Sequence, residues 1–203
     1  MTTTCKIVLV GDAGTGKTCI ISRFVNDKFN KSQMTTACPS FCTKTLSYPQ
    51  YKKTINLDIW DTAGQEMYRS ISKLFYKNAS VGILVYDITS IKSFQNIKEY
   101  WYNELKQNTD SNIIFNLVGN KIDLFENEEV NEEEAKEYAK SINANFYLTS
   151  AKNNLEITNL FMQSGAKFID PNLNSENKGN SDDENIKKLE IIDNNQNRVC
   201  CKN

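Results

Sequence analysis

A glycine-rich segment near the N-terminus constrains the fold of this 203-residue chain more than any other feature. Residues 11–18 read GDAGTGKT, directly after the apolar run Ile7–Val10 and before a helical pattern that begins at Lys17. Glycines let such a loop curl so that backbone N–H groups point inward at an anion, and the helix adds its positive dipole end. Lysine adds a compact charge, and Thr18 adds a hydroxyl for Mg²⁺, which prefers oxygen. The pattern predicts a phosphate-binding loop. The alternative, a chance glycine-rich turn, is expected in about one chain in a hundred.

Strand-like apolar runs alternate with helical patterns over the first 170 residues. The expected strands are 6–10, 41–47, 54–60, 81–87, 113–119 and 145–148, and the expected helices are 17–26, 65–77, 93–108, 131–142 and 154–168. A short connection without a helix joins 41–47 to 54–60, which indicates an antiparallel hairpin at one edge. We therefore predict an α/β fold of the P-loop NTPase type. Its six-stranded, mostly parallel sheet has one antiparallel edge strand and helices on both faces.

The composition changes after Pro171. Residues 171–203 hold nine Asn and few apolar side chains, so they cannot bury enough surface to offset the entropy cost of ordering. We predict one globular domain over residues 1–170 and a disordered tail over 171–203, which ends in the pair Cys200-Cys201.

The overall composition excludes several classes of protein. The chain has no His, which rules out histidine triads, histidine general bases and histidine-ligated metals. A net charge of −1 gives no support to nucleic-acid binding. The N-terminus has no secretory signal, and no apolar run approaches the ~20 residues of a membrane span. The six cysteines form no CxxC pair, so we expect a reduced, cytosolic protein.

Three more motifs follow predicted strands, where ligands sit in open α/β sheets. Asp61–Gln65 reads DTAGQ: the carboxylate can hold Mg²⁺ through a water, the Gly64 N–H can approach a γ-phosphate, and Gln65 can orient an attacking water. A turn would explain this motif equally well if it stood alone. Asn120–Asp123 reads NKID, and Asp123 can accept both N–H donors on the pyrimidine edge of guanine, a pair that adenine lacks. A turn cap is the alternative role for Asn120. Ser150–Lys152 reads SAK and can close a base pocket.

Together, these four motifs make the chain resemble the Ras superfamily of small GTPases from about Lys6 to Phe168. The resemblance implies GTP and GDP as bound nucleotides, Mg²⁺ as cofactor and Gln65 as the catalytic residue. It implies that Thr18, Thr36 and, through a water, Asp61 hold the metal; Thr35 is the adjacent rival of Thr36. The implied nucleotide-binding residues are Ala13, Gly14, Thr15, Gly16, Lys17, Thr18, Cys19, Phe29, Thr36, Gly64, Asn120, Lys121, Asp123, Ser150, Ala151 and Lys152.

Within that superfamily the chain is most similar to the Rab family. Residues 60–70 read WDTAGQEMYRS, and Phe41, Trp60 and Phe75 match an aromatic triad of Rabs, although core packing explains these rings equally well. The CCKN ending and residues 37–41 resemble the early-endosomal Rab branch, with a departure at Ala37-Cys38-Pro39 that leaves partner identity open. Two lipid chains anchor a protein stably where one does not, so Cys200 and Cys201 are expected to carry geranylgeranyl groups.

The resemblance implies a monomeric, slow GTP hydrolase that acts as a membrane-anchored switch in endocytic vesicle trafficking. The implied partners are an exchange factor, a GTPase-activating protein, a GDP-dissociation inhibitor or escort protein, and effectors. The implied location is the cytosol and the cytoplasmic face of endosomal membranes. A GTP-bound scaffold with little hydrolysis remains an alternative because of Ala13, near the γ-phosphate, and the unusual loop. A small-metabolite kinase is a third, although only Arg23 and Arg69 lie in the globular part.

Overall fold

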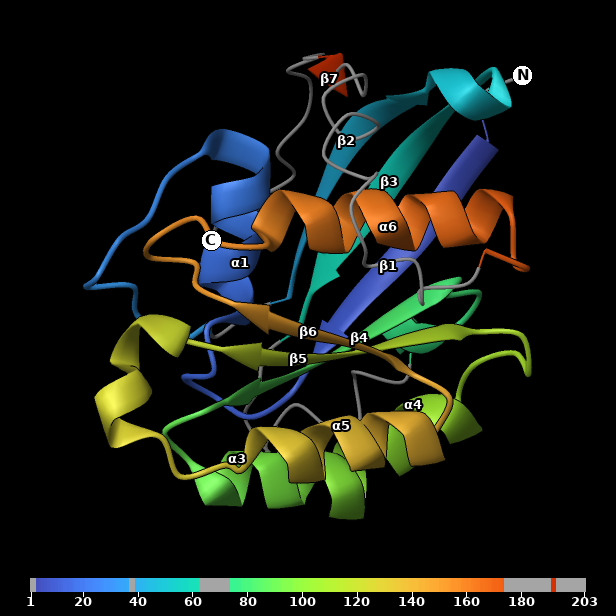
Figure 1. Cartoon of the computed structure of the whole chain (residues 1–203). Coiled ribbons are helices and arrows are strands. Elements are labelled where there is room, and N and C mark those ends of the chain that lie inside the picture. Colours follow the sequence, from blue (N-terminus) through green and yellow to red (C-terminus); the bar gives the residue numbers. More distant parts are fainter. Residues whose placement is uncertain (1–2, 37–38, 63–73, 174–190, 193–203) are drawn as a thin grey trace.

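The computed structural model describes residues 3–36, 39–62, 74–173 and 191–192. Its centre is a twisted sheet with the strand order β6-β5-β4-β1-β3-β2-β7 (Figure 1). The strands are β1 (Thr3–Val10), β2 (Ser40–Tyr48), β3 (Lys53–Asp61), β4 (Val81–Asp87), β5 (Ile114–Asn120), β6 (Asn145–Thr149) and β7 (Ile191–Ile192). Only β2 pairs antiparallel among the first six, so the predicted six-stranded sheet is confirmed. The two-residue β7 pairs antiparallel with β2 and comes from the segment predicted to be a tail.

Helices cover both faces of the sheet, as predicted. α1 (Lys17–Asn26) and α6 (Ile157–Ile169) lie on one face, and α3 (Ile91–Asn96), α4 (Tyr102–Gln107) and α5 (Glu132–Ser141) lie on the other (Figure 1). A π-helical turn over Ile97–Trp101 joins α3 to α4, so residues 91–107 form one uninterrupted helical stretch. This stretch was predicted as a helix over 93–108, but the wider turn was not predicted. No helix in the described ranges is long and apolar enough to cross a membrane.

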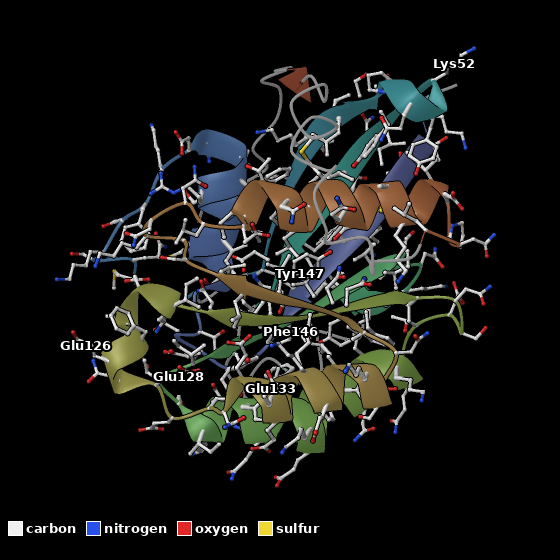
Figure 2. All side chains as sticks on the ribbon, in the orientation of Figure 1. Lys52, Glu126, Glu128, Glu133, Phe146 and Tyr147 are labelled. Atoms are coloured by element: carbon white, nitrogen blue, oxygen red, sulfur yellow. The ribbon has the colours of Figure 1, made fainter. Side chains whose placement is uncertain are left out.

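The strand patterns explain how the sheet is buried. All seven residues of β4 are buried, as expected of a central parallel strand that is covered on both faces. On β6, the consecutive residues Phe146 and Tyr147 point to opposite faces (Figure 2). Tyr147 belongs to the core shared with α1 and α6, while Phe146 packs against the core under α3–α5. The sheet therefore separates two apolar cores, and its strand ends are left to carry polar side chains.

Two short segments differ from the sequence prediction. The hairpin connection contains a 3₁₀ turn at Pro49–Tyr51, and a second 3₁₀ segment, Ile122–Asn127, follows the NKID motif. Of the helix expected over 65–77, residues 74–77 are described: residues 74–76 are helical and Lys77 lies in a turn. Residues 65–73 lie outside the described part of the chain.

Candidate functional site

The carboxyl-end loops of β1, β5 and β6 meet around a cavity of about 360 Å³, which the segment after α1 also lines. Many of the predicted site residues line this cavity, although they come from four separate parts of the sequence. They are Ala13, Gly14, Gly16, Lys17, Thr18, Cys19, Phe29, Thr36, Asn120, Lys121, Asp123, Ala151 and Lys152. The parallel strands bring these segments together because their carboxyl ends lie along the same edge of the sheet.

The other predicted residues either do not line the cavity or lie outside the residues that the structure describes. Thr15 is buried, and its hydroxyl donates to the carbonyl oxygen of Asp12 at 3.0 Å. Ser150 is fully buried and donates from Oγ to Asp123 Oδ1 at 2.6 Å, so it orients the carboxylate that was assigned to base recognition. Gly64, Gln65, Cys200 and Cys201 lie outside the described residues.

The glycine-rich loop has the backbone that its composition predicts. Gly16, at the N-cap of α1, has φ of 95°, and a Cβ atom there would lie 2.3 Å from Asn120 Nδ2. A side chain at this position would therefore push the loop away from β5. Asn120 Nδ2 in turn donates to the carbonyl oxygen of Thr15 at 2.8 Å. The loop is held against the sheet by this amide.

Lys17 is a buried cation at the start of α1. Its Nζ donates to the carbonyl oxygens of Gly11 at 2.7 Å and Asp12 at 2.8 Å, and the side chain is 5% exposed. Burial lowers the pKa of Lys17 to about 8, against the opposing effect of the Asp61 and Asp12 carboxylates. A buried ammonium group beside backbone N–H groups is a strong site for a phosphate anion.

Three oxygen-bearing side chains meet beside Lys17. Thr18 Oγ1 lies 2.5 Å from Thr36 Oγ1 and donates to Asp61 Oδ2 at 2.6 Å. Asp61 is 2% exposed, burial raises the pKa of its carboxyl group, and its Oδ1 has no hydrogen-bond partner among the described residues. An unsatisfied buried carboxylate oxygen beside two hydroxyls fits a hard divalent cation such as Mg²⁺. Thr36 rather than its rival Thr35 makes the contact with Thr18.

The opposite end of the cavity carries Asp123. Its carboxylate is 8% exposed, accepts from Ser150 and lies 3.4 Å from Lys152 Nζ. A carboxylate has about four acceptor positions, so Asp123 keeps the capacity to accept two further N–H groups. This is the hydrogen-bonding capacity that the pyrimidine edge of guanine requires.

Asn120 and Lys121 connect the two ends of the site. Asn120 is 1% exposed; besides its donation to Thr15, its Oδ1 accepts from Thr149 Oγ1 at 3.1 Å and from the Ala151 N–H at 3.4 Å. It therefore ties three loops together and does more than cap a turn. Lys121 has φ of 72°, a conformation that is rare outside glycine, and its Nζ lies 2.5 Å from Asp87 Oδ2.

Some lining residues were missed by sequence reasoning. They are Asn30, Lys31, Gln33, Met34 and Leu124. Thr35, which the sequence analysis named as the rival of Thr36, lines the cavity as well. Residues 30–34 belong to no motif, but they lie between the predicted Phe29 and Thr36, and this position in the sequence was a usable signal. Leu124 directly follows the NKID motif.

The carboxylate of Asp12 was also missed. It accepts from Trp101 Nε1 at 2.7 Å and from Asn96 Nδ2 at 2.6 Å. Asn96 directly precedes the π-helical turn and Trp101 is its last residue, and the two donors hold the phosphate loop against the 91–107 helical stretch. The carboxylate thus points toward that helix, and no sequence motif indicated the contact.

The three aromatic residues singled out in the sequence form a row. The ring centroid of Trp60 lies 4.9 Å from that of Phe41 and 5.2 Å from that of Phe75. The row crosses from β2 over β3 to the helical residues 74–76. The three rings therefore make a continuous aromatic contact across these elements.

Comparison with known proteins agrees with this geometry. The Ras family model matches residues 6–170. The chain belongs to the Ras family. It is 42% identical to human Ras-related protein Rab-22A over 176 residues, which cover 86% of this chain and 89% of that protein. It is also 42% identical to human Ras-related protein Rab-21 over 165 residues, with coverage of 81% and 72%. The chain is a Rab-like small GTPase, and its reaction is the hydrolysis of GTP to GDP. Proteins of this family bind guanine nucleotides and Mg²⁺.

Proposed function

We propose that this chain binds GTP or GDP with Mg²⁺ in the described cavity and acts as a membrane-anchored switch in endocytic vesicle trafficking. One observation carries the proposal. A single cavity has a buried ammonium and an oxygen cluster at one end, and a hydrogen-bonded Asp123 carboxylate at the other. This arrangement suits a ligand with phosphates at one end and guanine at the other.

Each predicted residue has a distinct role in this proposal. The backbone of residues 13–19 and the Lys17 ammonium hold the phosphates. Thr18 and Thr36 ligate the metal, and Asp61 holds it through a water. Phe29 and the stem of Lys121 flank the base, and Asp123 reads its edge. The residues that support this reading are Asn120, Ser150, Ala151 and Lys152.

Hydrolysis depends on positioning and on charge. When bound, Mg²⁺ supplies positive charge to the phosphate oxygens. Gln65 orients the attacking water, and the Gly64 N–H meets the γ-phosphate. The Arg23 guanidinium is engaged with loop carbonyls and Asp27, which leaves it unavailable to the γ-phosphate. In this proposal a GTPase-activating protein supplies the arginine that completes the site, as the family resemblance implies, and hydrolysis without it is slow.

The proposed biology follows from the termini and the relatives. Geranylgeranyl groups on Cys200 and Cys201 anchor the protein to the cytoplasmic face of endosomal membranes. A GDP-dissociation inhibitor or escort protein keeps the lipid-modified form in the cytosol. An exchange factor loads GTP, and effectors bind the loaded state. Similarity to Rab-22A and Rab-21 supports this placement.

The first test identifies the nucleotide that the purified protein carries. Recombinant protein is denatured without prior nucleotide treatment, and the released nucleotide is separated by chromatography. We expect about one GDP per chain. Intact GTP would favour the scaffold alternative, because hydrolysis would then be negligible. Adenine nucleotide would contradict the role of Asp123, and an empty site would contradict tight guanine binding.

A further inference from the structure

Arg23, on α1, reaches across to the loop that closes the base end of the cavity. Its Nε donates to the carbonyl oxygen of Ala151 at 2.9 Å, and its Nη2 donates to the carbonyl oxygen of Lys152 at 3.1 Å. Its Nη1 donates to the carbonyl oxygen of Asp27 at 3.0 Å and to Asp27 Oδ1 at 2.9 Å. The side chain is 14% exposed, and its partners at 151 and 152 are more than 120 residues away in sequence. One guanidinium thus makes four hydrogen bonds to two separate segments.

Because Arg23 lies on α1, its hydrogen bonds connect the phosphate end of the cavity to the base end. α1 begins at Lys17 and Thr18, the phosphate and metal end of the site, whereas Ala151 and Lys152 line the base end. In Figure 1, α1 and the loop between β6 and α6 lie side by side. Because a helix is stiff, the guanidinium fixes the distance between the two ends of the cavity. Arg23 does not line the cavity, so its effect on a ligand passes through the loop.

On its other side the loop is held by neutral hydrogen bonds and by the 3.4 Å contact between Lys152 Nζ and Asp123 Oδ2. The Ala151 N–H lies 3.4 Å from Asn120 Oδ1, and Ser150 pairs with Leu155 through backbone hydrogen bonds of 3.0 and 3.2 Å. These contacts hold Ser150 and, through its hydroxyl, Asp123. They do not reach the carbonyl groups of 151 and 152. The guanidinium of Arg23 supplies charge-assisted bonds to these carbonyl groups, and charge-assisted hydrogen bonds are the stronger kind.

We propose that Arg23 is a positioning residue that sets the rate of nucleotide release by holding residues 151–152 against the base. The inference rests on the proposed guanine-nucleotide binding and adds a determinant that none of the site motifs contains. Release of the base requires this loop to move outward, and outward movement must break the bonds to the guanidinium. A lysine at 23 keeps the charge but loses the planar fork, so it preserves only part of the effect.

The test measures release of GDP that carries a fluorescent N-methylanthraniloyl group on the ribose. Full-length protein is loaded with this GDP in Mg²⁺, and dissociation is followed after addition of excess unlabelled GDP. We expect Arg23→Met to release it about 10- to 100-fold faster and Arg23→Lys to give an intermediate rate. Lys136→Met is the matched control: it removes a cation with two ion-pair partners, Glu132 and Glu133, on the far helix α5. It is expected to leave release unchanged.

A second measurement separates positioning from general loss of structure. Single-turnover hydrolysis of pre-bound GTP depends on the phosphate end, so it should stay within about twofold of the parent in both Arg23 variants. A release rate in Arg23→Met within twofold of the parent would overturn the inference. So would a parallel fall in hydrolysis, because that would indicate distortion of the whole site. Should Arg23→Met fail to fold, Arg23→Lys decides alone. A parent protein that binds no labelled GDP would refute the proposed function itself, and this is measured first.

Discussion

Replacing Asp123 by Asn tests the base-recognition end of the cavity most directly. The carboxylate accepts from Ser150 and has two further acceptor positions toward the cavity. In the proposed complex these accept the N1–H and the 2-amino group of guanine. A hydrogen bond to a charged group contributes about 1.5–3 kcal/mol, so two contribute about 3–6 kcal/mol. At 1.4 kcal/mol per tenfold, Asp123→Asn is expected to weaken GDP binding by about 10²- to 10⁴-fold.

The same substitution should create affinity for a different base. An Asn amide offers one donor and one acceptor, and xanthine presents an N1–H and a carbonyl group at C2. We therefore expect Asp123→Asn to bind xanthosine diphosphate more tightly than GDP, whereas the parent prefers GDP. Competition against fluorescent GDP or its xanthine analogue measures both preferences, with Glu133→Gln on the exposed face of α5 as a matched control (Figure 2).

A reversed preference, for xanthosine diphosphate over GDP, would exclude misfolding as the cause of weaker GDP binding. Misfolding would weaken both nucleotides together and would improve neither. Equal GDP affinity in the parent and Asp123→Asn would refute base recognition by this carboxylate, even if the cavity still bound phosphates through Lys17.

Three further substitutions and one chemical treatment test other parts of the molecule. Gln65→Leu should slow single-turnover GTP hydrolysis by about 10- to 100-fold while GDP affinity is kept, and equal turnover would remove Gln65 from the mechanism. Thr18→Ala should raise the Mg²⁺ concentration needed for slow GDP release by about tenfold or more, as measured by Mg²⁺ titration. Trp101→Phe removes a donor to the Asp12 carboxylate and should lower the free energy of unfolding by about 1–2 kcal/mol in urea. Burial raises the pKa of Cys5 to about 12, so iodoacetamide at pH 8 should modify this thiol only after unfolding. The folded state keeps a proton that the unfolded thiol releases, so stability should fall as pH rises from about 9 toward 12.

Much of the architecture could be predicted from local pattern. A helical pattern placed α1, and a continuous apolar run placed β4, at the residue bounds observed. The hairpin of β2 and β3 followed from two apolar runs with a short connection. These predictions succeed because the periodicity of a segment shows which face it must bury, and a four-residue connection is too short for a parallel crossover.

Part of the site could also be predicted from the sequence. The chemistry of a side chain is known from its residue type alone, and the ends of parallel strands bring the motif residues to one edge of the sheet. These residues are Lys17, Thr18, Asp61, Asp123 and the SAK segment. Their motif spacing therefore indicated a nucleotide site before any contact was known.

Other features depend on contacts between segments that are distant in sequence. Three sets of hydrogen bonds join residues that no local sequence pattern relates. Arg23 donates to Ala151, Trp101 and Asn96 donate to Asp12, and Asn120 bonds to three other residues. The way in which the helices pack on the sheet decides which donor reaches a distant acceptor. The spacing of the two residues in the sequence does not predict this. The sequence by itself determined the fold class, the order of the elements and the chemical groups of the site. Only the tertiary structure decided which side chains hold those groups in place, because that depends on packing distances of a few ångströms.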